Sequence, residues 1–276
     1  MPTPYELVFG DPALAQRLDA IGAEAEARQV NAADPERFLQ LAAAGELLRE
    51  LRPEGTDAGG LLDLGRLIFH AYHYRLAGEP LYRLDEPLAR RLLASPPPVG
   101  PWTLAPPAPA GYLGLPRQLL WARVAAGAAA EPVDGIFWRA DEAAVDRRLD
   151  ALLVLGLRAD RPGFSVAGVS AVAPDGGHWA DLQARVDGPD FANILPGGEL
   201  RGLHGLVTEA EVLKLLSLCF WHMAAHPDAA VRDVAGSEAG AAGNAAGAAA
   251  ERESAAGEAS PAAGRVYRVR DVARDG

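Results

Sequence analysis

The chain has 276 residues, of which 49% are hydrophobic and 23% are charged, and its formal net charge is −11. A chain of this length and apolar content can bury one large core or two modest ones, which excludes disorder throughout. The acidic balance opposes general attraction to nucleic-acid phosphates or anionic lipid surfaces. We therefore expect neither nucleic acid nor a membrane as a partner.

The sequence also predicts a cellular compartment. Its single cysteine, Cys219, excludes an intramolecular disulfide. The first residues lack the basic and apolar regions of a signal peptide. No run of about 18 uncharged apolar residues is long enough to cross a bilayer. We therefore expect a cytoplasmic protein.

The first region, residues 1–94, has the apolar periodicity of amphipathic helices. Asp11 and Asp34 each precede a proline, which is the pattern of an N-cap residue before the first helical position. The apolar stripe that follows Asp34 predicts one helix that continues to Leu51.

The same region is expected to hold further short elements. Apolar spacing predicts a third helix over 61–77, with Gly78 at its carboxyl end. A short strand or turn at 80–84 follows, and Asp85 caps a helix expected over 86–93.

A proline-rich linker over 95–110 separates this helical region from a second region, 111–234, of short apolar runs. Strands are expected at 119–124, 133–139, 151–158, 164–172 and 178–186. Helices followed by strands predict an α+β fold, in which an amino-terminal helical layer packs on a mostly antiparallel meander sheet.

A late helix is predicted over 208–226, beginning at a capping box formed by Thr208 and Glu211. Apolar residues occupy most of its circumference, so the helix should be deeply buried or lie at an interface. We expect it to contact a protein partner or a second copy of the chain. Trp102 and Tyr112, beside the proline-rich linker, are expected to be exposed aromatic residues that support this interpretation.

The carboxyl-terminal part changes composition twice. Residues 235–264 are almost entirely Ala, Gly, Ser and Glu, and such a low-complexity segment cannot bury enough apolar surface to offset its ordering entropy, so we expect disorder. Residues 265–276 regain an alternating pattern, which predicts an edge strand and a short tail.

The strongest candidate site is the run around His70, Tyr72 and His73. Two histidines three residues apart on a helix share a face and could act as acid, base or binding groups. The alternative is that these amphipathic aromatic residues pack between the helix and the sheet. No third ligand is evident nearby, so we expect no metal and no cofactor.

Glu131 and Asp134 form a second candidate, as an acid/base pair or a cation site opposite the histidines. The structural alternative is ordinary turn or bulge chemistry, because Asp134 precedes a glycine. The sequence has no phosphate-binding loop, no dinucleotide fingerprint, no nucleophile elbow and no Cys-x-x-Cys motif.

We therefore expect a non-catalytic cytoplasmic interaction or accessory protein, as a subunit of a larger assembly. The alternative is a small-molecule enzyme whose site lies between the helical layer and the sheet and uses His70, Tyr72 and His73.

Overall fold

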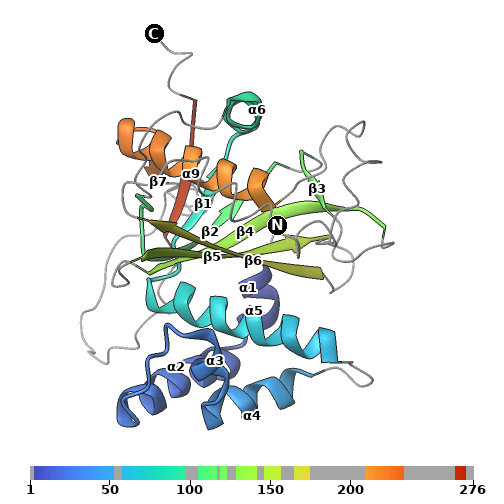
Figure 1. Cartoon of the computed structure of the whole chain (residues 1–276), viewed down its shortest axis with the longest axis vertical. Helices are drawn as coiled ribbons and strands as arrows, with labels where there is room; N and C mark the ends of the chain where they lie inside the picture. The colour runs from blue at the N-terminus through green and yellow to red at the C-terminus, as the bar shows by residue number, and fades with distance from the viewer. Residues whose placement is uncertain are drawn as a thin grey trace, which may run out of the picture.

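The computed structural model describes residues 3–52, 58–96, 105–116, 119–122, 129–141, 146–156, 165–174, 209–232 and 265–271. These residues form three layers, with a mixed sheet between a large helical layer and a pair of helices (Figure 1). The expected α+β class, with amino-terminal helices and a late buried helix, is confirmed.

The large layer consists of the amino-terminal helices, of which α5 lies against the sheet (Figure 1). These helices are α1 (Pro4–Phe9), α2 (Pro12–Ala27), α3 (Pro35–Leu39), α4 (Ala42–Leu51) and α5 (Ala58–Leu76). Asp11 and Asp34 cap α2 and α3 as expected, because each side chain accepts a hydrogen bond from a backbone N–H in the first turn. The left-handed backbone of Gly78, with φ of +82°, follows α5.

The prediction of one helix from Asp34 to Leu51 was wrong, because the chain breaks at Leu41 between α3 and α4. The cause is a carboxylate from another helix. Glu24 of α2 accepts hydrogen bonds from the backbone N–H groups of Ala42 (3.0 Å) and Ala43 (2.8 Å). These bonds lower the pKa of Glu24, with the Ala43 bond the largest cause. The start of α4 is thus capped by a side chain from α2.

The sheet has the strand order β6-β5-β4-β2-β1-β8-β7, and β3 pairs with β4 beside this path. The strands are β1 (Leu81–Leu84), β2 (Ala110–Gly114), β3 (Trp121–Ala122), β4 (Glu131–Asp141), β5 (Asp146–Leu155), β6 (Ser165–Pro174), β7 (Ala230–Arg232) and β8 (Val266–Val269). β1 runs parallel to β2 and β8, whereas all other pairs are antiparallel. The meander is therefore the β4–β5–β6 part of a mixed sheet.

Two features of the sheet differ from expectation. The segment at 265–276 does return to the sheet, but β8 lies between β1 and β7, so it is not an edge strand. β2 was not anticipated, and it places Tyr112 in the core with only 3% of its surface exposed. The expectation that Tyr112 is exposed was therefore wrong. The expected strand at 178–186, the low-complexity segment 235–264, Thr208 and Trp102 lie outside the described residues.

The sheet has a core on each face, because successive side chains of a strand point to opposite sides. In β4, Phe137 joins the core under α5, whereas Trp138 joins the core under α9 (Glu209–Ala225). Gly111 permits this arrangement, because a Cβ there would overlap the Trp138 ring. α6 (Glu86–Ala94) packs beside α9, whose residues 212–220 are all buried.

Candidate functional site

The structure separates His70 from Tyr72 and His73, whose rings meet edge to face with their centres 4.9 Å apart. His70 points toward the sheet, where its ring lies 6.5 Å from that of Phe137. His73 lies toward α3, with its Nε2 atom 3.1 Å from the carbonyl oxygen of Ala32. Tyr72 packs against Phe38 and lines a cleft in the helical layer. The three side chains therefore do not converge on one reacting position.

His70 occupies a buried position between the helix and the sheet. Its Nδ1 atom is buried and has no hydrogen-bond partner among the described residues. Burial is the main cause that lowers the pKa of His70 to about 3, so the imidazole is neutral near physiological pH. The positive charges of Arg139 and Arg66 act in the same direction. The surroundings are those of a packed core histidine.

A buried ion pair accompanies His70 on this face of the sheet. Arg139 of β4 lies 3.3 Å from the carboxylate of Asp150 of β5, its cross-strand neighbour. The guanidinium also stands 5.7 Å from the centre of the Phe69 ring of α5, at cation–π distance. These contacts fix α5 on the sheet.

The carboxylates proposed to face the histidines lie further along β4. Glu131 is six residues before Phe137, which corresponds to about 20 Å along a strand. Its Oε2 atom is buried without a described hydrogen-bond partner. Burial raises the pKa of the Tyr112 hydroxyl, and the negative charge of Asp134 acts in the same direction. The structure does not bring Glu131 to His70.

No three His, Cys, Asp or Glu side chains in the described part of the chain are placed to hold a metal ion. Burial raises the pKa of the Cys219 thiol to about 12, so this cysteine stays a protonated thiol. Within the ranges that the structure describes, none of the helices is both long and apolar enough to cross a membrane.

One surface feature involves the late helix. α9 is buried along most of its length, but Trp221 leaves 64% of its surface exposed. Beside it lies an apolar groove of about 380 Å³ whose lining residues are Tyr82, Ala105, Pro106, Pro107, Phe220, Met223, Ala224, Ala230 and Tyr267. Trp221 precedes Ala224 by three residues on α9, although its own side chain is not part of the groove lining. We call these residues the Trp221 groove.

Aromatic rings form the base of the Trp221 groove. Tyr82 and Tyr267 stack with their ring centres 5.0 Å apart. Tyr82 and Phe220 each also contact Trp138, at 5.5 and 5.1 Å. These rings come from three strands and α9, so the groove has a rigid aromatic base.

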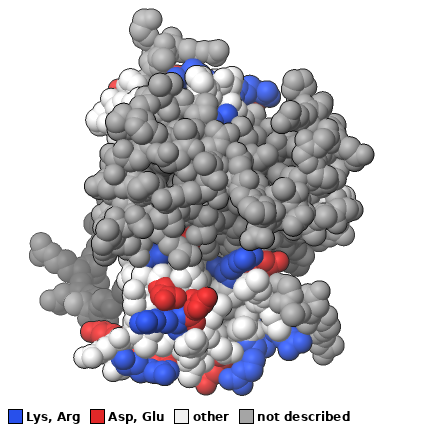
Figure 2. Space-filling view, in the orientation of Figure 1, with Lys and Arg blue, Asp and Glu red and all other residues white. Residues whose placement is uncertain are grey.

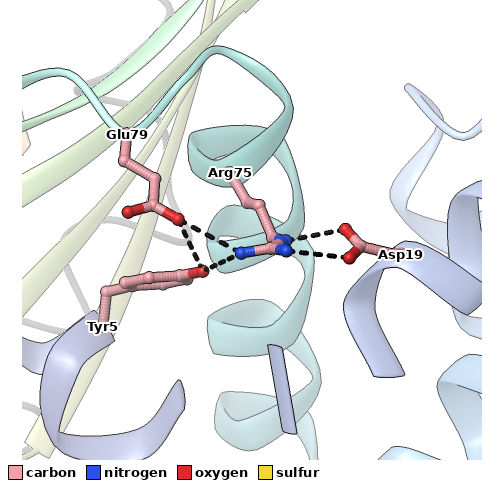
Figure 3. Close-up of polar contacts among 4 residues, drawn as sticks. All are labelled: Tyr5, Asp19, Arg75 and Glu79. Atoms are coloured by element: carbon pink, nitrogen blue, oxygen red, sulfur yellow. Dashed lines mark hydrogen bonds and ion pairs between the residues drawn. The ribbon is translucent and has the colours of Figure 1, made fainter. Parts of the chain in front are cut away.

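A second feature is a polar cluster that sequence reasoning missed. Arg75 of α5 donates two hydrogen bonds to Asp19 of α2, at 2.6 and 2.8 Å, and it also reaches Tyr5 of α1 and Glu79, both at 3.3 Å (Figure 3). Tyr5 in turn donates to Glu79 at 2.9 Å. Arg75 thus connects two helices and the turn before β1. Its only sequence signal is its place at the end of the histidine run.

The electrostatics of this cluster follow from its pairing. The hydrogen bond from Arg75 is the largest cause that lowers the pKa of Asp19, and the same contact raises the pKa of Arg75. Burial raises the pKa of Tyr5 to about 12, so its hydroxyl remains a donor. The contact between Asp19 and Arg75 therefore favours the charged form of both groups.

The four residues line a cleft of about 940 Å³ between α1, α2 and α5. We call it the helical-layer cleft. In the face drawn in Figure 2, acidic and basic side chains lie beside one another over the helical layer. The cleft differs from that surface because acidic residues predominate in its lining.

The fold defines the molecule as an α+β protein with helices on both faces of a mixed sheet. No protein-family model and no curated protein matches the chain. Among solved structures, the chain is similar to the crystal structure of AcrVA2, with a TM-score of 0.41 and 13% identity. The match covers 76% of this chain and 66% of that chain, just under two thirds of its length. At this similarity, function has to be argued from the residues themselves.

Proposed function

We propose that this chain is a non-catalytic cytoplasmic interaction protein that acts as a subunit of a larger assembly and self-associates through the end of α9. The supporting observation is Trp221, a large aromatic residue that is exposed directly after the buried length 212–220 of α9. Tryptophan is among the residues that contribute most to the stability of protein interfaces. The same end of α9 also contributes Phe220, Met223 and Ala224 to an apolar groove, which offers a place to receive such a side chain.

This arrangement favours a second copy as the partner. In a two-fold symmetric dimer each copy presents the same surface patch to the other. The Trp221 side chain of one copy can then enter the Trp221 groove of its partner, and the reverse contact forms at the same time. The burial of α9 refines the sequence prediction, because the contact is confined to the exposed end of the helix.

The alternative, a small-molecule enzyme, has less support. His70 is enclosed between α5 and the sheet, and Tyr72 and His73 lie toward other helices. Neither the helical-layer cleft nor the Trp221 groove is lined by His70 or by a carboxylate of β4. The single cysteine, buried as a free thiol, is compatible with the proposed cytoplasmic location.

The test is the mass of the full chain, measured by size-exclusion chromatography with light scattering over a concentration series. We expect a dimer for the wild type and an at least about thirtyfold weaker dimer for Trp221→Ser, because hot-spot residues contribute this much. The matched control is Leu62→Ser, which changes another exposed apolar residue on α5 and should leave the dimer intact. A wild-type monomer at every concentration, or equal effects of the two substitutions, would contradict the proposal.

The substitution that tests the dimer has to be made at an exposed residue. Leu216 lies in the middle of α9 and has no exposed surface, so a charged residue there would disrupt the fold itself. Trp221 avoids this difficulty because its removal leaves the core under α9 unchanged.

A further inference from the structure

The helical-layer cleft lies on the other side of the sheet from the Trp221 groove and has a distinct chemistry. Its charged lining residues are Glu6, Asp19, Glu26, Glu79 and Arg75. Four carboxylates against one guanidinium give a formal charge of 1 − 4 = −3. A concave surface lined by one sign of charge focuses the potential and attracts the opposite sign.

The one cation of the cleft is already engaged. Arg75 directs its donors to Asp19, Tyr5 and Glu79, and the bidentate contact with Asp19 fixes the plane of the guanidinium. A carboxylate can accept about four hydrogen bonds, so Asp19 and Glu79 keep acceptor capacity after these contacts. No side-chain partner for Glu26 is found within the described ranges. The cleft therefore offers hydrogen-bond acceptors to a ligand that carries hydrogen-bond donors.

The apolar part of the lining suits an aliphatic chain that ends in a cation. Leu76 has 70% of its surface exposed and borders the cleft, whereas Tyr72 and Phe9 are buried residues at the back of its lining. Lysine and arginine side chains bury their methylene stems along such surfaces while the charged end meets carboxylates or aromatic faces. Small residues make the cleft possible, since Gly22 leaves room for the Tyr72 hydroxyl beside α2.

From this charge complementarity we propose that the helical-layer cleft binds a lysine- or arginine-bearing segment of a partner protein. The basic side chain enters between α2 and α5, with its stem on Leu76 and its charge on Glu26, Asp19 and Glu79. The contact is separate from self-association, because the two surfaces lie on opposite faces of the sheet.

The test is fluorescence anisotropy of a fluorescein-labelled hexa-arginine peptide titrated with the full chain at low and physiological salt. We expect binding that weakens with salt. Glu26→Lys should weaken it about tenfold, because two unit charges change near the ligand. The control Glu46→Lys makes the same charge change at an exposed position of α4, outside the cleft. It should weaken binding of the peptide by less than about twofold.

A second pair of variants separates shape from charge. Ala23 is exposed and lines the cleft, so Ala23→Trp obstructs it while every carboxylate stays in place. Ala20→Trp is the control, on the same helix but outside the lining. Loss of binding for Ala23→Trp alone supports the site.

Four results would overturn this proposal: no binding of the peptide, equal weakening by Glu26→Lys and Glu46→Lys, unchanged binding by Ala23→Trp, or displacement of the peptide by spermidine. Absence of binding would mean that the cleft is not a site for basic segments. Equal weakening by the two lysine substitutions would mean that the peptide responds to the net charge of the protein. Displacement of the peptide by spermidine at equal charge concentration would assign the cleft to free polyamines instead. Trp221→Ser should bind the peptide as the wild type does, so failure of the dimer proposal remains distinguishable.

Discussion

The two faces of the sheet solve the same packing problem with different residues. Under α9, the core is centred on large apolar side chains such as Trp138 and Leu216. Under α5, the core contains the Arg139–Asp150 ion pair and the neutral imidazole of His70. The strand alternation of β4 sends Trp138 to one face and Arg139 to the other. One residue of register thus decides which side chains of β4 meet α9 and which meet α5.

The buried ion pair gives the largest expected effect. Asp150→Ala leaves the Arg139 charge without this carboxylate, so we expect the free energy of unfolding to fall by about 3–5 kcal/mol. Chemical denaturation measures this loss. The double variant Arg139→Met, Asp150→Leu should recover most of the stability, because apolar residues of similar volume can replace a buried pair. A double variant no more stable than Asp150→Ala would show that this face depends on its charges.

The core under α9 should respond to lost volume. Leu216→Ala removes a fully buried side chain, so the free energy of unfolding should fall by about 2–5 kcal/mol in urea denaturation. Trp221→Ala on the same helix should cost less than about 1 kcal/mol, because most of that side chain is already exposed. Similar losses for the two variants would contradict the division of α9 into a buried length and an exposed end.

His70 makes the α5 face sensitive to pH. Its folded pKa of about 3 lies below its ordinary value of 6.5, so below about pH 6.5 the unfolded chain binds a proton that the native state excludes. Stability therefore falls as the pH falls from about 6.5 toward 3. Between about pH 7 and pH 5 this costs about 2 kcal/mol, which His70→Leu should abolish in denaturation curves at both pH values. An unchanged pH dependence in the variant would place the imidazole in contact with water.

The smallest expected effect concerns the polar cluster of the helical layer. Arg75→Met should lower the free energy of unfolding by about 1–2 kcal/mol, because four hydrogen bonds are lost in a partly exposed network. Arg17→Met breaks one exposed ion pair, with Glu50, and should cost less than about 0.5 kcal/mol. Thermal unfolding of both variants decides whether Arg75 holds α1, α2 and α5 together.

The pH dependence of this cluster has a defined sign. Arg75 lowers the pKa of Asp19 in the folded state. Their contact therefore stabilises the fold fully at pH values above the ordinary aspartate pKa of about 4. This stabilisation is lost as the pH falls through the lower, folded-state pKa. In acid, the difference in stability between the wild type and Arg75→Met should therefore narrow.

Local signals predicted those parts of the fold that depend on neighbouring residues. The Asp-Pro starts of α2 and α3 and the carboxyl end of α5 at Gly78 follow from capping and backbone preferences within a few positions. The apolar circumference of α9 likewise predicted a buried helix.

Long-range contacts explain what the sequence did not reveal. The break at Leu41 depends on Glu24, and β2 is a short glycine-containing strand that is held by pairing with β1 and β4. The site residues show the same limit, since Asp19 and Arg75 are 56 positions apart. Helical spacing placed His70 and His73 in one candidate site, whereas packing of α5 turns His70 toward Phe137 of the sheet and His73 toward the carbonyl oxygen of Ala32.

The central claim is that the α9 face, not the helical layer, meets a second copy. It is tested most directly by pulsed electron paramagnetic resonance on the full chain with a spin label at Asp228→Cys, an exposed position just after α9. The native Cys219 is buried and remains unlabelled. We predict short intermolecular distances for this label and none for a label at Glu46→Cys in the helical layer. Short distances from Glu46→Cys alone, or no intermolecular signal from either label, would contradict the account.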